Sequence, residues 1–241
     1  MELVNGVFIG CSVNNAVTDG TSFWHFFNTF TEITKGALKI SKVPDFCRET
    51  VFNSQVVLKF PLADPPLLSP ATNRITEISS FQSLCAQLWR SVTRARNLEP
   101  TKTTTFRIAV NCRHRLDPKL NPYYFGNAIQ SIPNFALVGE LLANDMSWGA
   151  NLLHKNMVAH DNEMVRQGVE DWEGQPRLFP LGNADVRSGR ANKFDGKISA
   201  FPGREENKSI DLEVVLAPET MVGLENDAEI MQYVSEMELV N

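Results

Sequence analysis

Residues 11–20 read CSVNNAVTDG, and they join an apolar run at 4–13 to the aromatic run SFWHFFNTF. Valine, isoleucine and phenylalanine in the first run predict a buried strand, which should end at the asparagine pair. The glycine that closes the quoted stretch predicts a turn, and Thr21 or Ser22 can cap a helix with its side-chain oxygen. The spacing of the aromatic side chains then predicts a helix over 22–33 that packs on the strand.

Composition and charge narrow the class of protein. The chain has 241 residues, 43% of them hydrophobic, which is enough for one domain or two small ones. The net charge is −5, from 23 basic and 28 acidic residues that are mixed along the chain, so we expect no nucleic-acid partner. Four cysteines without a C-x-x-C pair favour free thiols over a zinc site. The short apolar run after Glu2 fits neither a signal peptide nor a membrane span, so we expect a cytoplasmic protein without a membrane partner.

The first half of the chain contains a proline-rich stretch and a helix. Prolines accumulate between 41 and 74, which predicts a linker with at most one strand, at 55–60. Ser79 or Ser80 can cap the helix that follows. The apolar face expected for this helix consists of Phe81, Leu84, Leu88 and Val92. Its arginines are expected outside, or near the C-terminal end where positive charge suits the helix dipole: Arg90, Arg94 and Arg96.

The second half alternates strands and helices. Alternating polarity predicts a strand at 103–112, and the strand pattern resumes at 123–132. Residues 136–172 read as helical, with a break near Gly149 or around Asp161. Two short apolar runs, 197–201 and 210–216, predict an antiparallel hairpin, and Pro218 opens a last helix over 218–236.

Several separated segments resemble one family, the plant acyl-CoA-dependent acyltransferases known as BAHD. The stretch Asn15-Ala-Val-Thr-Asp19-Gly20 resembles the His-x-x-x-Asp-Gly signature of these enzymes. Residues 79–96, 106–129 with Tyr-Phe-Gly-Asn, and 186–221 resemble further segments of the same family in the same order. Together these segments cover most of the chain.

The resemblance implies an α/β fold like chloramphenicol acetyltransferase, a two-layer αβ sandwich of two similar domains that face each other across a channel. On this basis residues 1–60 would be the remnant of an incomplete N-terminal domain, 61–74 a shortened crossover linker and 75–241 the C-terminal domain. Acyl-CoA would serve as co-substrate and a small-molecule alcohol or amine as acceptor. No bound cofactor, metal or covalent acyl-enzyme is implied.

The resemblance also assigns roles to individual residues. Asn15 holds the position of the family's histidine base, and Asp19 holds the position of an aspartate that pairs with an arginine and fixes the loop. Arg113 is our first choice for that arginine and Arg115 our second. The alternative is that both arginines are solvated on a strand.

The chain departs from the family pattern in three places. An amide at Asn15 has no titratable lone pair near neutral pH and cannot take a proton from an acceptor hydroxyl. The family's Asp-Phe-Gly-Trp-Gly motif is missing, because Asn183 runs almost directly into Val186. The chain also begins only just upstream of the base position. We therefore expect an inactive or weakly active acyltransferase.

The four histidines offer no replacement for the base. Two lie in an aromatic run or between arginines, and two lie six residues apart on one expected helix, where they share no face. In chain order they are His25, His114, His154 and His160. A structural role is the interpretation we favour for each of them.

An incomplete N-terminal domain would leave apolar side chains such as Phe23, Phe26 and Phe27 without cover. We therefore expect a marginally stable monomer that self-associates. Two alternatives to an enzyme stay open. One is a non-catalytic protein that binds acyl-CoA or acceptor, or that modulates an intact relative by pairing with it. The other is a shortened product with no function of its own.

Overall fold

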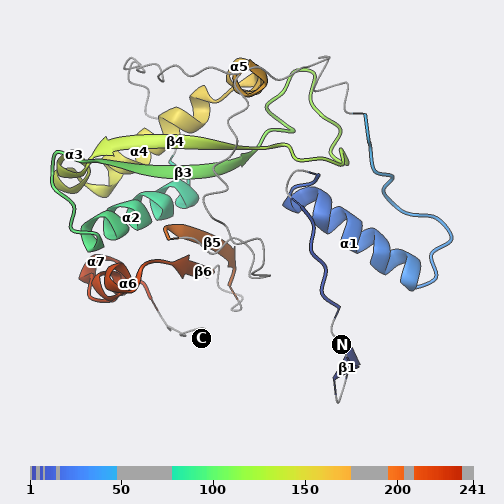
Figure 1. The fold of residues 1–241 in the computed structure, drawn as a ribbon, viewed down its shortest axis with the longest axis horizontal. Helices are drawn as coiled ribbons and strands as arrows, with labels where there is room; N and C mark the ends of the chain where they lie inside the picture. The colour runs from blue at the N-terminus through green and yellow to red at the C-terminus, as the bar shows by residue number, and fades with distance from the viewer. Residues whose placement is uncertain are drawn as a thin grey trace. The chain divides into compact units, whose positions relative to one another are not determined.

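The computed structural model describes residues 2–3, 6–7, 9–14, 17–47, 78–174, 195–203 and 209–234. The chain divides into two compact units, each built from several stretches of sequence. Unit 1 comprises 1–63, 108–132 and 159–176, and unit 2 comprises 64–107, 133–158 and 177–241. Figure 1 shows the helices and strands along the chain.

Unit 1 contains one long helix and short strands. Strands β1 (Glu2–Leu3) and β2 (Gly6–Val7) pair antiparallel, and helix α1 runs over Gly20–Thr34. An isolated bridge joins Asp45 to Tyr124, where Phe125 N donates to Asp45 O at 2.7 Å. Helix α5 (Asn162–Gly174) completes the unit, and Gln130 Nε2 donates to Val165 O at 2.9 Å to hold it.

Unit 2 is built around helix α2 (Ser80–Ala95), whose N-terminus is a capping box. Gln82 N donates to Ser79 Oγ at 3.3 Å, and Ser79 N donates to Gln82 Oε1 at 2.8 Å. Each side chain thus satisfies a backbone N–H that the first helical turn leaves unpaired. The serine expected from the sequence to cap this helix is therefore confirmed.

Strands β3 (Thr103–Asn111) and β4 (Ile129–Leu137) form a two-stranded sheet whose strands Figure 1 shows as long neighbouring arrows. Trp89 of α2 donates from Nε1 to Thr104 Oγ1 at 3.1 Å, so the helix is tied to β3 by a buried hydrogen bond. Helices α3 (Val138–Ala143) and α4 (Met146–Ala159) follow β4. The buried Asn134 of β4 accepts at Oδ1 from Asn156 Nδ2 of α4 at 2.8 Å.

The C-terminal elements pack on α2. Strands β5 (Lys197–Pro202) and β6 (Ile210–Val215) form the antiparallel hairpin expected from the sequence, with Lys197 opposite Val215. Helices α6 (Pro218–Glu225) and α7 (Ala228–Met231) follow. Their buried leucine and isoleucine, Leu224 and Ile230, form an apolar core with Leu88.

Several boundaries differ from the sequence-based expectation. The strand expected over 4–13 is wrong in extent, because among the described residues of that range the strand is limited to Gly6–Val7, which pairs with β1. Residues 9–14 are exposed and irregular, and no strand of the described part of the chain pairs with them. The strand expected at 123–132 lies instead at Ile129–Leu137 and passes through Pro133. An edge strand tolerates a proline, because it has one unpaired side.

The helical boundaries also need correction. Of the two breaks considered, the one around Asp161 is confirmed, whereas Gly149 lies buried inside α4. A further break separates α3 from α4. The last helix, expected to be continuous over 218–236, stops at Glu225 because Asp227 accepts from Glu229 N at 2.9 Å and caps a new helix.

Arg90 is buried, contrary to the expectation that it lies outside α2. Its Nη1 donates to Leu141 O at 2.6 Å and also to Asn144 O, which satisfies carbonyl groups at the C-terminal end of α3. Arg90 is therefore buried because its guanidinium satisfies carbonyl groups at the C-terminal end of α3. Arg94 lies half-exposed and pairs with Asp227 and Glu229.

The linker expected at 61–74 and the strand expected at 55–60 lie outside the described residues, so the domain boundaries stay a prediction. Among the helices that the structure describes, none combines the length and apolar character needed to cross a membrane.

Gly223 generates a first prediction. A Cβ at this position would lie 3.0 Å from Ala95 O and 3.1 Å from Ala95 Cα, so α6 approaches the backbone of α2 too closely for a side chain. We expect Gly223→Ala to lower the free energy of unfolding by about 1–3 kcal/mol, because helix backbone cannot move aside easily. Chemical denaturation measures this difference.

Gly20→Ala is the control, since a Cβ at position 20 would meet no atom within 4 Å. It should leave the free energy of unfolding nearly unchanged. Equal effects of the two variants would contradict the packing interpretation.

Candidate functional site

The end of the motif loop is fixed by a helix cap. Asp19 adopts an extended conformation before α1 and accepts from Ser22 N at 2.9 Å through Oδ1. The cap expected from the sequence was Thr21 or Ser22, so the structure moves it upstream to Asp19. Thr18, Asp19 and Ser22 are all buried, and the entry of the chain into α1 is therefore enclosed in unit 1.

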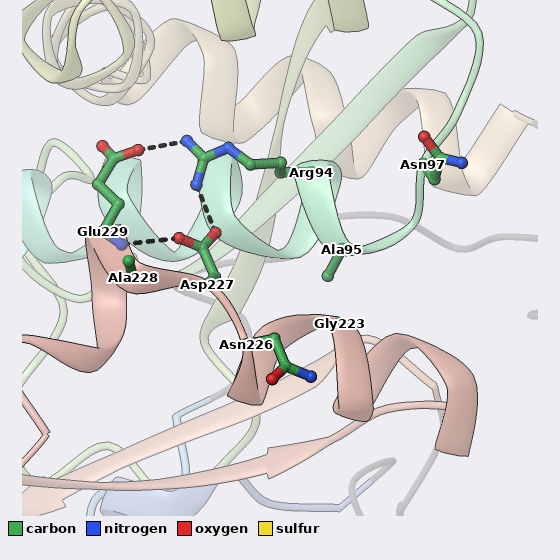
Figure 2. Close-up of a pocket in the computed structure, with 8 residues that line it drawn as sticks. All are labelled: Arg94, Ala95, Asn97, Gly223, Asn226, Asp227, Ala228 and Glu229. Carbon is green, nitrogen blue, oxygen red and sulfur yellow. Dashed lines mark hydrogen bonds and ion pairs between the residues drawn. The ribbon is translucent and has the colours of Figure 1, made fainter.

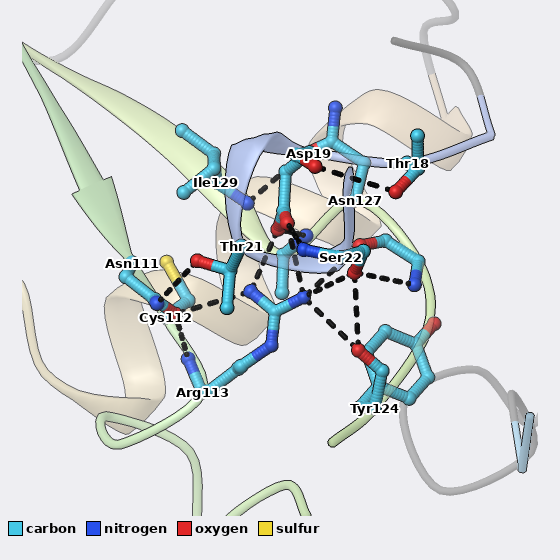
Figure 3. Close-up of polar contacts among 12 residues, drawn as sticks. Thr18, Asp19, Thr21, Ser22, Asn111, Cys112, Arg113, Tyr124, Asn127 and Ile129 are labelled. Atoms are coloured by element: carbon cyan, nitrogen blue, oxygen red, sulfur yellow. Dashed lines mark hydrogen bonds and ion pairs between the residues drawn. The ribbon is translucent and has the colours of Figure 1, made fainter. Parts of the chain in front are cut away.

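Arg113 lies two residues beyond β3 and contacts Asp19 with both ends of its guanidinium (Figure 3). Nη1 donates to Asp19 Oδ2 at 2.6 Å, and Nη2 lies 3.1 Å from Oδ1. Both side chains are almost completely buried, with exposed fractions of 1% for Arg113 and 2% for Asp19. Such bidentate pairs are strong and geometrically specific because the planar fork matches a carboxylate.

The same guanidinium binds a second segment of chain. Nη2 of Arg113 lies 3.1 Å from Tyr124 O, 3.1 Å from Gly126 O and 2.9 Å from Ser22 Oγ. Ser22 Oγ in turn lies 2.9 Å from Gly126 O and accepts from Gly126 N at 3.2 Å. Figure 3 shows the guanidinium between Asp19 and the Tyr124 carbonyl.

Gly126 is required by this close approach. A Cβ there would lie 2.6 Å from the Tyr124 ring, which folds back over the same turn. The Tyr124 ring centroid also lies 5.8 Å from the Arg113 guanidinium carbon, within cation–π range. The Tyr-Phe-Gly-Asn segment at 124–127 therefore encloses the Arg113 guanidinium together with the first turn of α1.

The electrostatics of Asp19 follow from two opposing effects. Burial raises its pKa, and hydrogen bonds from Arg113, Ala128 N and Ser22 N lower it by more, so the net shift is downward. Asp19 remains a carboxylate under ordinary conditions.

This carboxylate has no capacity left for a substrate. Its two oxygens accept from both Arg113 nitrogens, from Ser22 N and from Ala128 N at 2.9 Å. A carboxylate with four protein donors is saturated and cannot also serve as a general base. What the arrangement can do is hold the loop before α1 in one position.

Asn15 itself lies outside the described residues. Its neighbour Asn14 accepts at its backbone oxygen from Val17 N at 2.9 Å and from Thr18 N at 3.3 Å, so the loop turns at this point. In the sequence, position 15 lies between Asn14, where this turn begins, and Asp19, which caps α1.

Three histidines of the described part make hydrogen bonds to protein groups. His25 Nε2 lies 2.8 Å from Lys42 O, His160 Nε2 lies 2.8 Å from Gln130 Oε1, and His154 Nδ1 lies 3.1 Å from Gln82 Nε2. Burial and the nearby Arg115 lower the pKa of His160, while Asp161 opposes them. His114 is exposed.

Arg115, the second choice as partner of Asp19, is occupied elsewhere. Its Nη1 donates to His160 O at 2.6 Å, next to the start of α5. The structure therefore brings Asp19 together with Arg113 and not with Arg115. Sequence analysis gave Ser22 only as a possible helix cap and did not assign Gly126 or Ala128, although the Tyr-Phe-Gly-Asn segment, which contains Gly126, was a signal.

A pocket in unit 2 is a second candidate (Figure 2), but its charged groups are already paired with one another. Arg94 binds Asp227 and Glu229 across it. The lining residues are Arg94, Ala95, Asn97, Gly223, Asn226, Asp227, Ala228 and Glu229. Within the described part of the chain, no three potential metal-binding side chains of His, Cys, Asp or Glu converge.

Asp19→Asn should destabilise the chain by about 3–5 kcal/mol, because it leaves the buried Arg113 without its counter-charge. The effect should also depend on pH. Since the pKa of Asp19 is lowered in the folded chain, the carboxylate stabilises the fold above its ordinary value of 3.8, and this contribution is lost as pH falls through the lowered pKa. Denaturation curves at several pH values measure both effects.

Glu32→Gln is the matched control. The pKa of Glu32 is also lowered, mainly by hydrogen bonds from Ser41, but Glu32 and Ser41 make these hydrogen bonds at the surface. Its loss should cost far less than the loss of Asp19. A comparable cost for both variants would show that the buried pair is not a major source of stability.

Comparisons with known proteins identify related chains. The model of the Transferase family matches residues 2–76 and 68–186. BAHD acyltransferase DCR from Arabidopsis thaliana is 29% identical over 95% of the chain and 61% of its own length. Shikimate O-hydroxycinnamoyltransferase from Nicotiana tabacum is 27% identical over 73% of the chain and 49% of its own length.

A solved structure with a similar fold is TRI101. TRI101 of F. sporotrichioides, crystallised with Coenzyme A and T-2, superposes with a TM-score of 0.61 at 14% identity, over 90% of the chain and 64% of TRI101. The α/β fold class expected from the sequence is confirmed. The chain spans less than two thirds of the length of DCR and of TRI101. With the family model matched over most of its residues, the chain belongs to the Transferase family, the family of the BAHD acyltransferases.

Proposed function

We propose that the chain derives from enzymes that transfer an acyl group from acyl-CoA to a hydroxyl or amine of a plant metabolite, and that it retains little or no turnover. The names of its relatives support both acceptor types. The tobacco relative is a shikimate O-hydroxycinnamoyltransferase, and a rice relative, 36% identical over 38% of the chain, is putrescine hydroxycinnamoyltransferase 3. We place this activity in the cytoplasm.

The proposed reaction depends on one proton transfer. A base removes the proton of the acceptor hydroxyl or amine, and the resulting nucleophile attacks the thioester carbonyl. A tetrahedral oxyanion forms, then collapses with loss of the CoA thiolate. Acyl-CoA is therefore a co-substrate, and no covalent acyl-enzyme is needed.

The amide at Asn15 is the observation that carries the proposal. It occupies the position of the base and cannot accept the acceptor's proton. Loss of a general base typically reduces the rate by about 10²–10⁴. His25, His154 and His160 each direct one ring nitrogen to a protein group, which supports the structural role that we favour for them.

The buried pair of Asp19 and Arg113 supports the other half of the proposal. Its contacts hold the loop before α1 in place. An enzyme of this type would need such a fixed loop to position a base at residue 15. We infer that the device for positioning the base persists without the base. Restoring the imidazole is therefore a meaningful test.

We expect Asn15→His to increase the release of CoA from a hydroxycinnamoyl-CoA, in the presence of alcohol and amine acceptors, by up to about 10²–10⁴. A thiol reagent measures the released CoA. Asn14→His is the matched control, since it adds the same imidazole one residue away and should give no increase.

The outcomes separate the alternatives. Robust turnover by the native chain, with no gain from Asn15→His, would refute the lost-base proposal. If neither protein turns over but calorimetry detects acyl-CoA binding, a non-catalytic binding function replaces it. Without turnover or binding, the chain has no acyl-CoA function.

A further inference from the structure

Ser22 is a small polar residue that contacts both Arg113 and the turn at 124–126 (Figure 3). It lies in the first turn of α1, and only 1% of it is exposed. The groups that its hydroxyl contacts are 91 to 104 residues away in the sequence. A buried hydroxyl is costly unless it is hydrogen-bonded, so this position needs both neighbours in place.

The hydroxyl of Ser22 uses its full hydrogen-bonding capacity. A serine hydroxyl has one hydrogen to donate and two lone pairs that accept. Its Oγ accepts from Arg113 Nη2 at 2.9 Å and from Gly126 N at 3.2 Å. The hydrogen can then be donated to Gly126 O at 2.9 Å or to Tyr124 O at 3.2 Å. In the contact with Arg113, the guanidinium therefore donates and the hydroxyl accepts.

The guanidinium of Arg113 is held through its two terminal nitrogens. Within the described part of the chain, its buried Nε atom has no hydrogen-bond partner. Nη1 donates to Asp19 Oδ2 at 2.6 Å, whereas Nη2 has four acceptors around its two hydrogens. Of these four, Ser22 Oγ is nearest, at 2.9 Å against 3.1 Å for each of the others. The orientation of Nη2 therefore depends on Ser22.

Ser22 contacts the ion pair through two separate groups. Its backbone N donates to Asp19 Oδ1 at 2.9 Å and makes the helix cap. Its hydroxyl binds Arg113, which in turn binds the same carboxylate. A substitution of the side chain leaves the backbone N–H in place, so the contribution of the hydroxyl can be measured while the cap is kept.

We propose that Ser22 is a positioning residue of this site: its hydroxyl orients the Arg113 guanidinium, and Arg113 in turn orients the carboxylate of Asp19. Without the hydroxyl, Gly126 N loses an acceptor and Arg113 Nη2 loses its nearest one. The guanidinium would then turn more freely between Asp19 and the turn carbonyls. A consequence for catalysis at position 15 rests in addition on the proposed function.

Rotation of the Arg113 guanidinium about its Nε–Cζ bond tests the proposal. With isotope labelling, the NMR signals of Nη1 and Nη2 are separate while this rotation is slow, and they merge when it is fast. We expect separate signals in the native chain. In Ser22→Ala the rotation should be about tenfold faster, because it no longer has to break a hydrogen bond between the charged guanidinium and the hydroxyl.

Thr21→Ala is the matched control. Thr21 is the exposed neighbour of Ser22, and its Oγ1 lies 3.4 Å from Asn111 Nδ2. This variant should leave the rotation of Arg113 unchanged. If Ser22→Ala does not fold, Ser22→Cys replaces it, because a thiol is a weaker acceptor of similar size.

Ser22→Thr is the rescue variant. It keeps a hydroxyl but adds a methyl group to a packed site, so it can lower the melting temperature. The rotation of Arg113 should nevertheless stay slow. A residue that contributed only packing would show the reverse, with the rotation independent of the hydroxyl and stability following the added or removed volume.

A kinetic measurement connects Ser22 to catalysis. In the Asn15→His background, Ser22→Ala should lower kcat about tenfold and leave KM nearly unchanged, because a buried residue that acts through the loop does not bind substrate itself. If Asn15→His is inactive, the proposed function fails. The rotation of Arg113 still decides the role of Ser22, since it is measured without substrate.

Three results would overturn the proposal. The first is the same rotation rate in the native chain and in Ser22→Ala, whatever the change in stability. The second is an equal acceleration by Thr21→Ala or by Ser22→Thr. The third is an unchanged kcat for Ser22→Ala in an active Asn15→His background.

Discussion

The buried ion pair of Asp19 and Arg113 is the constraint that organises unit 1. It joins the start of α1 to the segment after β3, and through the carbonyls of Tyr124 and Gly126 it includes a third stretch of the chain. A charge this deeply buried is tolerated only when it is paired and hydrogen-bonded. Removal of either partner would leave the other charge uncompensated. The packing of all three segments against one another would then be destabilised.

Under the proposed function, the structure separates the positioning of the loop before α1 from the chemistry at position 15. Every oxygen lone pair of Asp19 is directed to protein donors, and its role is complete without a substrate. The amide at Asn15 removes proton acceptance but removes none of these contacts. We therefore propose that this chain keeps the family's structural aspartate without the family's base, because the hydrogen bonds of Asp19 come from Arg113, Ser22 and Ala128.

Helix α1 is held within unit 1 by polar contacts and still exposes apolar side chains. Its first turn is fixed by Asp19 and Ser22, and its polar side is fixed by His25 and Glu32. Neither set of contacts uses the aromatic side chains. Burial of Ser22 in place of the phenylalanines follows from the hydrogen-bonding needs of the Arg113 guanidinium.

Periodicity in the sequence was enough to predict the helices over 20–34 and 80–95, the strand at 103–111 and the C-terminal hairpin. The reason is that a repeat of 3.6 or 2 residues reflects local backbone geometry. The motif resemblance led to Asp19 and Arg113 as a pair. The burial of Arg90, the cap at Asp227 and the carbonyl ligands of Arg113 emerged only in the folded chain. Arg90 contacts carbonyl groups 51 and 54 residues away, and Asp227 also binds Arg94, 133 residues away. Only folding decides which polar groups must find partners at one place.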